Sequence, residues 1–397
     1  MIRPTVARVD LRALTSNFRT LTEHLDAEPA RAGRFRPPRL IAVVKANAYG
    51  HGAAQVARAL EDAGADLLAC ADIEEGAVLR NSGVRAEILV FGALSVSDLD
   101  GLFDCRLTPT ISTPGAARAV QAAAAKHRQR VRYHLKIDTG MNRLGFRFDN
   151  LRRTLPEVLA SDHLELDAIY THFATADDPE SPLFNAQRER FERALVDIQS
   201  LATAAGIVMR PASSDAGLSS ASLPQPYVHA ANSAAMLRDS RVWWDRVRPG
   251  LLLYGLIPPP LGSTVQIKPV MTLGSRVVAV KGVRAGESVG YGARFVADDA
   301  RTVAIVPAGY ADGLDVRLAG RGAVLIRGRR APIVGSVCMD MLMADVTGLE
   351  VSPGDEVVII GPQGDDLIDV REMAAQIGTI PYEILCRIGS RIQRLYS

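Results

Sequence analysis

The sequence has few of the residues that mark several functional classes. It contains four cysteines in 397 residues, and aromatic residues make up only 5%. The cysteines are widely spaced, with no CxxC pair and no histidine at metal-binding spacing, which argues against a disulfide framework or a zinc site. No apolar run approaches 18 residues, so a transmembrane helix is not expected. The N-terminal MIRPTVARVD lacks the apolar stretch of a signal peptide, which predicts a protein of the reducing cytoplasm.

The sequence also has no large excess of either positive or negative charge. The 46 basic and 44 acidic residues leave a net charge of +2, which argues against a general nucleic-acid binder or a polybasic membrane anchor. Only five of the basic residues are lysine, and the other 41 are arginine. Because amine chemistry is not available to arginine, the few lysines are candidates for it. They are Lys45, Lys126, Lys136, Lys268 and Lys281.

Apolar segments alternate with helical patterns over the first two thirds of the chain. The segments at 40–46, 66–71, 87–92, 107–112, 131–138 and 164–173 are continuously apolar, as is typical of parallel strands covered on both faces. Repeated βα units over about 250 residues predict a (β/α)₈ barrel, with an open doubly wound sheet as the alternative. After the break at 257–263 the pattern changes to short strands punctuated by Gly and Pro. We expect a barrel over 1–258 and a mostly β domain over 259–397.

Lys45 and Lys136 both lie in segments expected to be buried strands. Lys45 ends the first of them, at the edge where the active sites of such barrels are found. An amine at that edge can form a Schiff base with a carbonyl group, whereas a structural lysine extends its charged end into solvent. Lys136 is followed by Asp138 and Arg143, and an ion pair among the three is the simpler interpretation.

Three further polar residues follow predicted strands. His172 is interpreted either as a hydrogen-bonded polar group or as a catalyst. Ser233 can cap a short helix or hold a phosphate with nearby backbone N–H groups. Arg248 precedes Gly250, which allows the backbone to approach a ligand closely, although a surface charge is an equally simple explanation for the arginine.

Taken in order, these motifs closely resemble the alanine racemase family, over nearly the whole chain. VVKANAYGHG (43–52) resembles its attachment site for pyridoxal phosphate (PLP). Other family blocks are HLKIDTGMNRLG (134–145), THFATAD (171–177), ANSAA (231–235), VRPG (247–250), GYADG (309–313), VCMD (337–340) and YEILCRIGSR (382–391). The resemblance implies a PLP-binding barrel followed by a β domain, with the first few residues joining the β domain. It also implies a homodimer whose active sites are shared between subunits.

The resemblance also assigns roles to individual residues. Lys45 would hold PLP and act as the base on one face of the substrate, and Tyr291 from the partner subunit would act on the other. The residues that resemble cofactor contacts are Tyr49, Arg143, His172, Asn232, Ser233, Arg248, Gly250, Leu251 and Tyr382. Those that resemble substrate contacts are Arg143, Tyr310 and Met339, and those that resemble supporting residues are His229, Asp340 and Lys136, the last matching a lysine carbamylated in many members.

Racemisation explains why two bases are needed. The α-proton must leave from one face and return to the other, so one proton-transferring group is required on each side. Arg248 would face the pyridine nitrogen of the cofactor. Because arginine stays protonated, that nitrogen would remain a neutral acceptor, which favours return of the proton over transamination.

Some positions depart from the family pattern, and several functions share its motifs. Asn142 stands where many members have Gly, Met341 where many have Gln, and the stretch 212–227 looks longer than usual. Alanine is the expected substrate, for supply of D-alanine to peptidoglycan, with a serine or broader-specificity racemase as the alternative. A decarboxylase on the related fold is disfavoured by Arg248, and a non-catalytic PLP-binding protein is disfavoured by the second domain and Tyr291.

Overall fold

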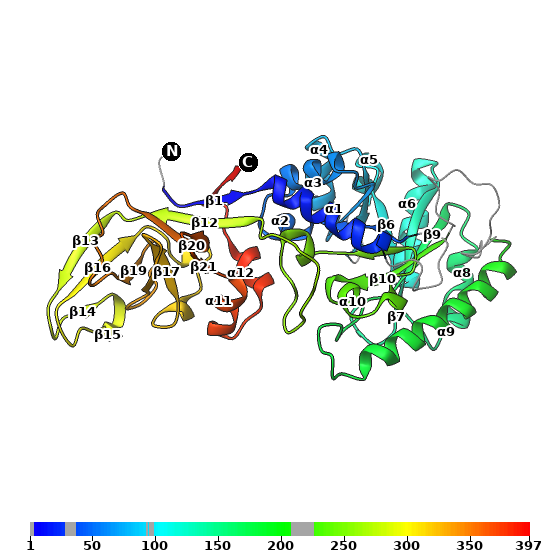
Figure 1. Cartoon of the computed structure of the whole chain (residues 1–397). Coiled ribbons are helices and arrows are strands. Elements are labelled where there is room, and N and C mark those ends of the chain that lie inside the picture. Colours follow the sequence, from blue (N-terminus) through cyan, green and yellow to red (C-terminus); the bar gives the residue numbers. More distant parts are fainter. Residues whose placement is uncertain (1–3, 28–36, 93, 95–98, 208–225) are drawn as a thin grey trace. The chain divides into compact units, whose positions relative to one another are not determined.

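The chain forms two compact units (Figure 1). The computed structural model describes residues 4–27, 37–92, 94, 99–207 and 226–397. One unit contains residues Thr15–Lys45 and Ala57–Ile267, and the other contains Met1–Leu14, Ala46–Val56 and Lys268–Ser397. None of the helices in the described ranges combines the length and the apolar character of a membrane span.

The larger unit is built on a parallel sheet that closes on itself. Its strand order is β2-β11-β10-β9-β7-β6-β5-β4-β3. β2 (Arg39–Leu40) and β3 (Ala42–Val43) are halves of one strand separated by Ile41; β2 pairs with β11 and β3 pairs with β4. Counting these halves as one gives eight positions in the described sheet, which confirms the (β/α)₈ barrel and makes the open-sheet alternative wrong.

The strands follow the apolar segments of the sequence closely. The remaining barrel strands are β4 (Leu67–Cys70), β5 (Glu87–Val90), β6 (Thr108–Ile111), β7 (Val131–Asp138), β9 (Leu164–Tyr170), β10 (Tyr227–Asn232) and β11 (Arg246–Arg248), with β8 (Phe146–Arg147) paired to β7. All residues of β4 and β6 are buried, as expected for parallel strands covered on both faces.

Helices alternate with these strands. They are α1 (Leu11–Ala27), α3 (Ala53–Asp62), α4 (Ile73–Asn81), α5 (Asp100–Asp104), α6 (Pro114–His127), α7 (Leu151–Thr154), α8 (Pro156–Leu159), α9 (Leu183–Ala204) and α10 (Ser233–Arg238), with 3₁₀ turns η1 (Ser240–Val242) and η2 (Leu251–Tyr254). α6 shows how local sequence sets the bounds: the Thr113 side chain accepts a hydrogen bond from the Ala116 N–H, and Pro114 occupies the first turn, where a missing N–H costs nothing.

The smaller unit is mostly β, as expected. Its strands are β1 (Val6–Val9), β12 (Met271–Arg276), β13 (Ala279–Val283), β14 (Ser288–Val289), β15 (Phe295–Val296), β16 (Arg301–Val306), β17 (Ala323–Ile326), β18 (Arg329–Pro332), β19 (Leu342–Asp345), β20 (Glu356–Gln363), β21 (Asp366–Ile368) and β22 (Gln393–Tyr396). The N-terminal β1 pairs antiparallel with β12 and parallel with β22. The short turns η3 (Tyr291–Ala293), η4 (Tyr310–Asp312) and η5 (Val316–Leu318) connect strands.

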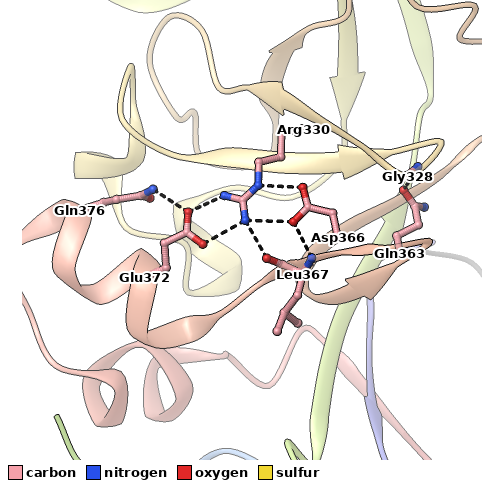
Figure 2. A network of polar contacts seen from close by, with 7 residues as sticks. All are labelled: Gly328, Arg330, Gln363, Asp366, Leu367, Glu372 and Gln376. Carbon is pink, nitrogen blue, oxygen red and sulfur yellow. Dashed lines mark hydrogen bonds and ion pairs between the residues drawn. The ribbon is translucent and has the colours of Figure 1, made fainter. Parts of the chain in front are cut away.

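Two helices in this unit, α11 (Val370–Ile377) and α12 (Pro381–Arg387), are absent from the strand pattern expected for it. Arg330 of β18 joins α11 to the sheet (Figure 2). Its Nε donates to Asp366 of β21 at 2.9 Å and its Nη2 donates to Glu372 of α11 at 3.1 Å. The two carboxylates favour the charged guanidinium and raise the pKa of Arg330 above its ordinary value.

Candidate active site

Lys45 lies where the sequence predicts, at the carboxyl end of a barrel strand. It follows β3 (Ala42–Val43), and the strand ladder continues to Val44, whose N–H donates to the Ala69 carbonyl at 2.8 Å. The next four residues, 46–49, all have positive φ angles between 51° and 54°. None of them is glycine, so this left-handed turn carries backbone strain of about 1–2 kcal/mol per residue. Strain of this kind is typical of functional sites.

Contacts within the smaller unit hold this turn, which spans Ala46–Tyr49. The buried His51 approaches the carbonyls of Ala48 and Tyr49 with Nδ1, at 3.0 and 2.9 Å. Two carbonyl acceptors at one nitrogen require that nitrogen to carry the hydrogen. Burial lowers the pKa of His51 to about 4, so the ring is neutral and holds the turn without adding charge.

Burial and four positively charged side chains of the barrel unit lower the pKa of His172. The pKa of His172 is lowered well below its ordinary value, first by burial and then by the positive charges of Arg248, Lys136, Arg143 and Lys45. The structure therefore brings together five of the residues predicted from the sequence. Like charges repel in a partly desolvated site, so the cluster is suited to an anion.

Lys136 is the buried member of this cluster. Lys136 is only 5% exposed, and its Nζ lies 5.6 Å from the centre of the Tyr170 ring. Burial, together with the charges of Arg143, Arg248 and Lys45, lowers the pKa of Lys136 to about 8. Asp138 opposes this shift, but its Oδ1 accepts hydrogen bonds from the backbone of Gly140 and Asn142. Lys136 thus has an appreciable fraction of free amine near neutral pH.

Arg248 is held by acceptors of the barrel interior. Its Nη1 donates to Nδ1 of His229 at 2.7 Å, and its Nη2 donates to the carbonyls of Thr171 and Ala230 at 2.8 and 2.7 Å. His172 Nδ1 lies 3.3 Å from the same Nη2. Burial lowers the pKa of Arg248 to about 10, so it remains a cation near neutral pH. The surface-charge interpretation of Arg248 is therefore wrong, because the residue is 4% exposed.

A second group lies at the start of α10. Of the two interpretations of Ser233, helix capping is wrong: Asn232 is the N-cap, and its Oδ1 accepts from the Ala235 N–H at 2.9 Å. Ser233 is instead buried, and its Oγ accepts from the backbone N–H of Gly250 at 2.8 Å, next to Leu251 at the start of η2. An oxygen that accepts from the protein keeps its own hydrogen for a ligand. Ser233 and the adjacent backbone N–H groups are therefore suited to a phosphate.

The smaller unit holds the other predicted residues. The rings of Tyr49 and Tyr382 lie 5.9 Å apart at a tilt of 44°. A Cβ at Gly50 would lie 2.1 Å from the carbonyl oxygen of Leu385, so this glycine permits the turn that carries Tyr49 to approach α12 closely.

Tyr291 is exposed in the single chain, at 76%. It begins η3, between Gly290 and Gly292, which both have φ of +73°. Its backbone carbonyl accepts from Ser336 Oγ at 2.7 Å. The backbone around Tyr291 is thus fixed while its phenol is left open to solvent.

Tyr310 and Met339 lie on two loops joined through their backbones. The N–H groups of Tyr310 and Ala311 donate to the carbonyls of Cys338 and Met339, both at 3.0 Å. This close approach depends on Gly309, where an added Cβ would lie 2.3 Å from both carbonyl oxygens. Asp340 accepts from Arg391 Nη2 at 2.6 Å. An open hollow of ≈ 1090 Å³ in the same unit is lined in part by Tyr291, Met339, Asp340, Met341 and Cys338.

Two of the departures from the family pattern fall on described residues. Asn142 has φ of +53°, a conformation that glycine adopts freely and asparagine tolerates better than most residues. The glycine found in many members is therefore explained by backbone conformation. Met341 is 44% exposed at the edge of the hollow, and nothing in the structure explains the choice of methionine there. Of the stretch 212–227, all but the last two residues lie outside the described residues.

Sequence reasoning missed part of the polar interior of the barrel. Tyr170 stacks on His229, with ring centres 4.6 Å apart, and the guanidinium carbon of Arg248 lies 5.2 Å from the centre of the Tyr170 ring. His134, Asp167 and Tyr227 also lie in the interior and are buried. A signal was available, because a histidine, an aspartate and a tyrosine in otherwise apolar strands are unusual.

Comparison with known proteins matches the sequence to one family. The model of the alanine racemase N-terminal domain matches residues 9–258, and that of the C-terminal domain matches residues 270–396. The chain is similar to the alanine racemase of Carboxydothermus hydrogenoformans, at 40% identity over the full length of both chains. It is also similar to the alanine racemase of Symbiobacterium thermophilum, at 40% identity over 100% of this chain and 97% of the relative.

Solved structures agree with the sequence relatives. An alanine racemase from Streptomyces lavendulae superposes with a TM-score of 0.87 and 33% identity, covering 100% of this chain and 98% of the other. One from Bartonella henselae, solved with covalently bound pyridoxal phosphate, superposes with a TM-score of 0.83 and 29% identity, covering 99% of both chains. The two domain matches and the full-length relatives together place this chain in the alanine racemase family of isomerases.

Proposed function

We propose that the chain interconverts L-alanine and D-alanine with pyridoxal phosphate as cofactor, and that Lys45 and Tyr291 are the two bases. The observation that carries the proposal is the position of Lys45 at the carboxyl end of a barrel strand, in the unit where Arg248 Nη2 lies 3.3 Å from Nδ1 of His172 and the charges of Lys45, Lys136 and Arg143 also act on that ring. Relatives named alanine racemase, 40% identical over the full chain, support alanine as the substrate.

The residues present suit this cofactor at both of its ends. The buried Ser233 Oγ and the N–H groups at the start of η2 offer donors for a phosphate. Arg248 uses one hydrogen of Nη1 and both hydrogens of Nη2 within the barrel; among the described residues no acceptor takes the hydrogen of Nε. That donor suits a pyridine nitrogen, which is an acceptor when neutral.

When bound, pyridoxal phosphate supplies the electron sink that acidifies the α-hydrogen of an attached amino acid. Lys45 would hold the cofactor through its amine and move a proton at Nζ on one face of the substrate. Tyr291 would move a proton at its phenol oxygen on the other face. Arg143 would bind the negative end of the substrate or cofactor, and the neutral His172 would pack beside the ring without adding charge.

A second copy of the chain would complete the site. Tyr291 is 76% exposed, whereas a base that acts on an α-carbon must lie within about 3 Å of its proton, in a site protected from water. Met339 and Met341 are 51% and 44% exposed beside it, an apolar character that suits a partner surface. We therefore propose a homodimer in which Tyr291, with Tyr310 and Met339, serves the barrel of the partner.

Supply of D-alanine to peptidoglycan and a cytoplasmic location remain predictions from the sequence. Cell fractionation tests the second, and rescue of a D-alanine-requiring bacterial strain tests the first. In that strain, growth without added D-alanine supports the role, whereas continued dependence contradicts it.

A rate assay against a panel of L-amino acids tests the substrate. The purified PLP-loaded chain is incubated with each amino acid, and the enantiomers are separated by chiral chromatography. We expect alanine to turn over fastest. Serine or a larger amino acid turning over at the rate of alanine would favour the broader-specificity alternative, and an α-decarboxylated product would favour the decarboxylase.

A further inference from the structure

A line of hydrogen bonds extends from Arg248 into the interior of the barrel. Nδ1 of His229 accepts from Arg248 at 2.7 Å, and Nε2 of His229 lies 3.0 Å from Nδ1 of His134. Nε2 of His134 lies 2.9 Å from the hydroxyl oxygen of Tyr227 and 3.6 Å from Oδ2 of Asp167. The five residues come from β7, β9, β10 and β11, so the line crosses half of the barrel strands.

The direction of this line follows from chemistry at one end. A guanidinium has only donors, so Nδ1 of His229 must be an acceptor without a hydrogen. A neutral His229 then carries its hydrogen on Nε2 and donates it to His134. Nδ1 of His134 is in turn an acceptor, and the hydrogen of His134 lies on Nε2, facing Tyr227 and the carboxylate of Asp167. The opposite direction would set a donor of His229 against a donor of Arg248.

Burial supports the neutral state that this reasoning assumes. His134 and His229 are both fully buried. Burial lowers the pKa of His134, against the opposing effect of Asp167, and it lowers the pKa of His229 well below its ordinary value, helped by the positive charge of Arg248. Burial raises the pKa of Tyr227, so its hydroxyl keeps its hydrogen.

We propose that His134 and Tyr227 are positioning residues: they hold His229 in the tautomer with hydrogen on Nε2, so that His229 fixes the guanidinium of Arg248 from behind. Asp167 lies at the far end of this line, and its carboxylate favours a hydrogen on Nε2 of His134, the ring nitrogen nearest to it. This inference rests on the proposed function in one respect, that Arg248 faces the cofactor. Partners that orient a metal-ligating histidine affect metal affinity or activity about 10–100-fold, and we expect an effect at the lower end of that range on cofactor affinity here.

The direct test is nitrogen NMR of the full chain labelled with ¹⁵N-histidine, first without pyridoxal phosphate and then loaded. The seven histidines give resolvable ring signals, and loss of one set in His134→Asn assigns that residue. We expect His134 and His229 to carry hydrogen on Nε2 and none on Nδ1, in both states. A hydrogen on Nδ1 of either ring, or a doubly protonated ring near neutral pH, would overturn the proposal.

Two substitutions at His134 separate positioning from packing. In His134→Leu the Nε2 hydrogen of His229 loses its acceptor, whereas the carbonyl of His134→Asn can still accept it. We expect the affinity for pyridoxal phosphate, measured by titrating the cofactor-free chain, to fall about tenfold in His134→Leu. The fall should be largely reversed in His134→Asn. Equal affinities in both variants and the parent would overturn the proposal.

Tyr227→Phe keeps the test decisive where both variants of His134 fail to fold. It removes only the acceptor of the His134 hydrogen, and Tyr133→Phe is its matched control, because Tyr133 is also a buried tyrosine of a barrel strand. We expect Tyr227→Phe to shift the Nε2 signal of one histidine and Tyr133→Phe to leave all histidine ring signals in place. Unchanged signals in Tyr227→Phe contradict the proposal. Because the cofactor-free chain is used, a failure of racemase activity does not alter these readings.

Discussion

Arg248 donates a hydrogen bond to His229, with 2.7 Å between Nη1 and Nδ1, and both residues lie inside the barrel. A buried cation that donates to a neutral imidazole keeps its charge, and its pKa of about 10 leaves it protonated at neutral pH. This pair therefore presents a fixed positive donor to whatever binds beside it. Under the proposed function, the group beside it is the pyridine nitrogen of the cofactor.

Replacing Arg248 with glutamine tests this role. Arg248→Gln keeps a donor but removes the charge, so we expect racemisation to slow on the order of 100-fold. The fraction of turnovers that end in keto acid instead of alanine should rise, because no cation beside the ring nitrogen then opposes its protonation. Chiral chromatography measures the first quantity and a coupled keto-acid assay the second. An unchanged keto-acid fraction would argue against control of the ring nitrogen by Arg248.

Lys45 is tested by a substitution that preserves its charge. Lys45→Arg keeps a cation at the end of β3 but removes the amine, so we expect loss of covalently held cofactor and of racemisation. Borohydride reduction followed by intact mass measures the cofactor. Lys268→Arg is the control, since Lys268 is exposed and should be replaceable with little effect. A reducible cofactor adduct in Lys45→Arg would assign the attachment to another lysine.

Isotope exchange separates the two bases. The equilibrium constant between alanine enantiomers is 1, so a single substitution must lower kcat/KM equally in both directions. In D₂O, however, Tyr291→Phe keeps one base, and we expect it to exchange the α-hydrogen of one enantiomer faster than it racemises that enantiomer. Mass spectrometry of each enantiomer measures the exchange. Equal exchange of both enantiomers would contradict a separate base on each face.

The amine of Lys136 is predicted to take up carbon dioxide. Its pKa of about 8 means that the free amine, the form that reacts, increases about tenfold between pH 7 and pH 9. At fixed dissolved ¹³CO₂ we expect a carbamate signal in carbon NMR that grows over this range and is absent in Lys136→Arg. A carbamate would place an anion beside Arg143 and Arg248. If the carbamate signal were absent at every pH, Lys136 would not be carbamylated.

The same shift makes stability depend on pH. The pKa of Lys136 in the folded chain, about 8, lies below the ordinary value of 10.5. Between these values the unfolded chain binds a proton that the folded chain lacks, so the contribution of this group to stability increases as pH rises from 8 to 10.5. Compared with Lys136→Met in urea unfolding, the parent should gain stability over that range. If the free energies of unfolding of the parent and of Lys136→Met changed in parallel over this pH range, the amine would not be desolvated in the folded chain.

The absence of a side chain at Gly309 is predicted to be necessary for the loop of Tyr310 to pack closely against the loop of Met339. In Gly309→Ala the added Cβ meets two backbone carbonyls at 2.3 Å, which cannot move aside as a flexible side chain can. We expect a loss of about 1–3 kcal/mol in the free energy of unfolding. Gly282→Ala is the matched control, because a Cβ at Gly282 meets nothing within 4 Å. Equal stability of the two variants in urea unfolding would show that the loop adjusts.

The barrel and the place of Lys45 were predictable because both depend on local patterns. Continuous apolar segments mark buried parallel strands, and a lysine that ends one of them lies at the carboxyl edge of the barrel. The left-handed turn after Lys45 was not predictable, because Ala46 and Ala48 ordinarily favour a right-handed helix. Tertiary contacts, including His51 and the approach of Gly50 to Leu385, override that preference.

The buried polar line was missed for a related reason. His134, Asp167 and Tyr227 come from three strands that are far apart in the sequence. The hydrogen bond between His134 and Tyr227, and the approach of Asp167 to His134, form only when the barrel closes. The choice of Asn232 as the cap of α10 was likewise decided by tertiary structure, because Ser233 is drawn to Gly250 on the next strand–helix connection. Local sequence cannot indicate which of two adjacent capping residues is engaged elsewhere.

The central claim is tested most directly by incubating the purified, PLP-loaded chain with L-alanine in D₂O and separating the products. The account predicts D-alanine that carries one deuterium on its α-carbon, formed by the parent chain and not by Lys45→Arg. Absence of D-alanine, or D-alanine that retains the original hydrogen throughout, would contradict proton exchange by two bases.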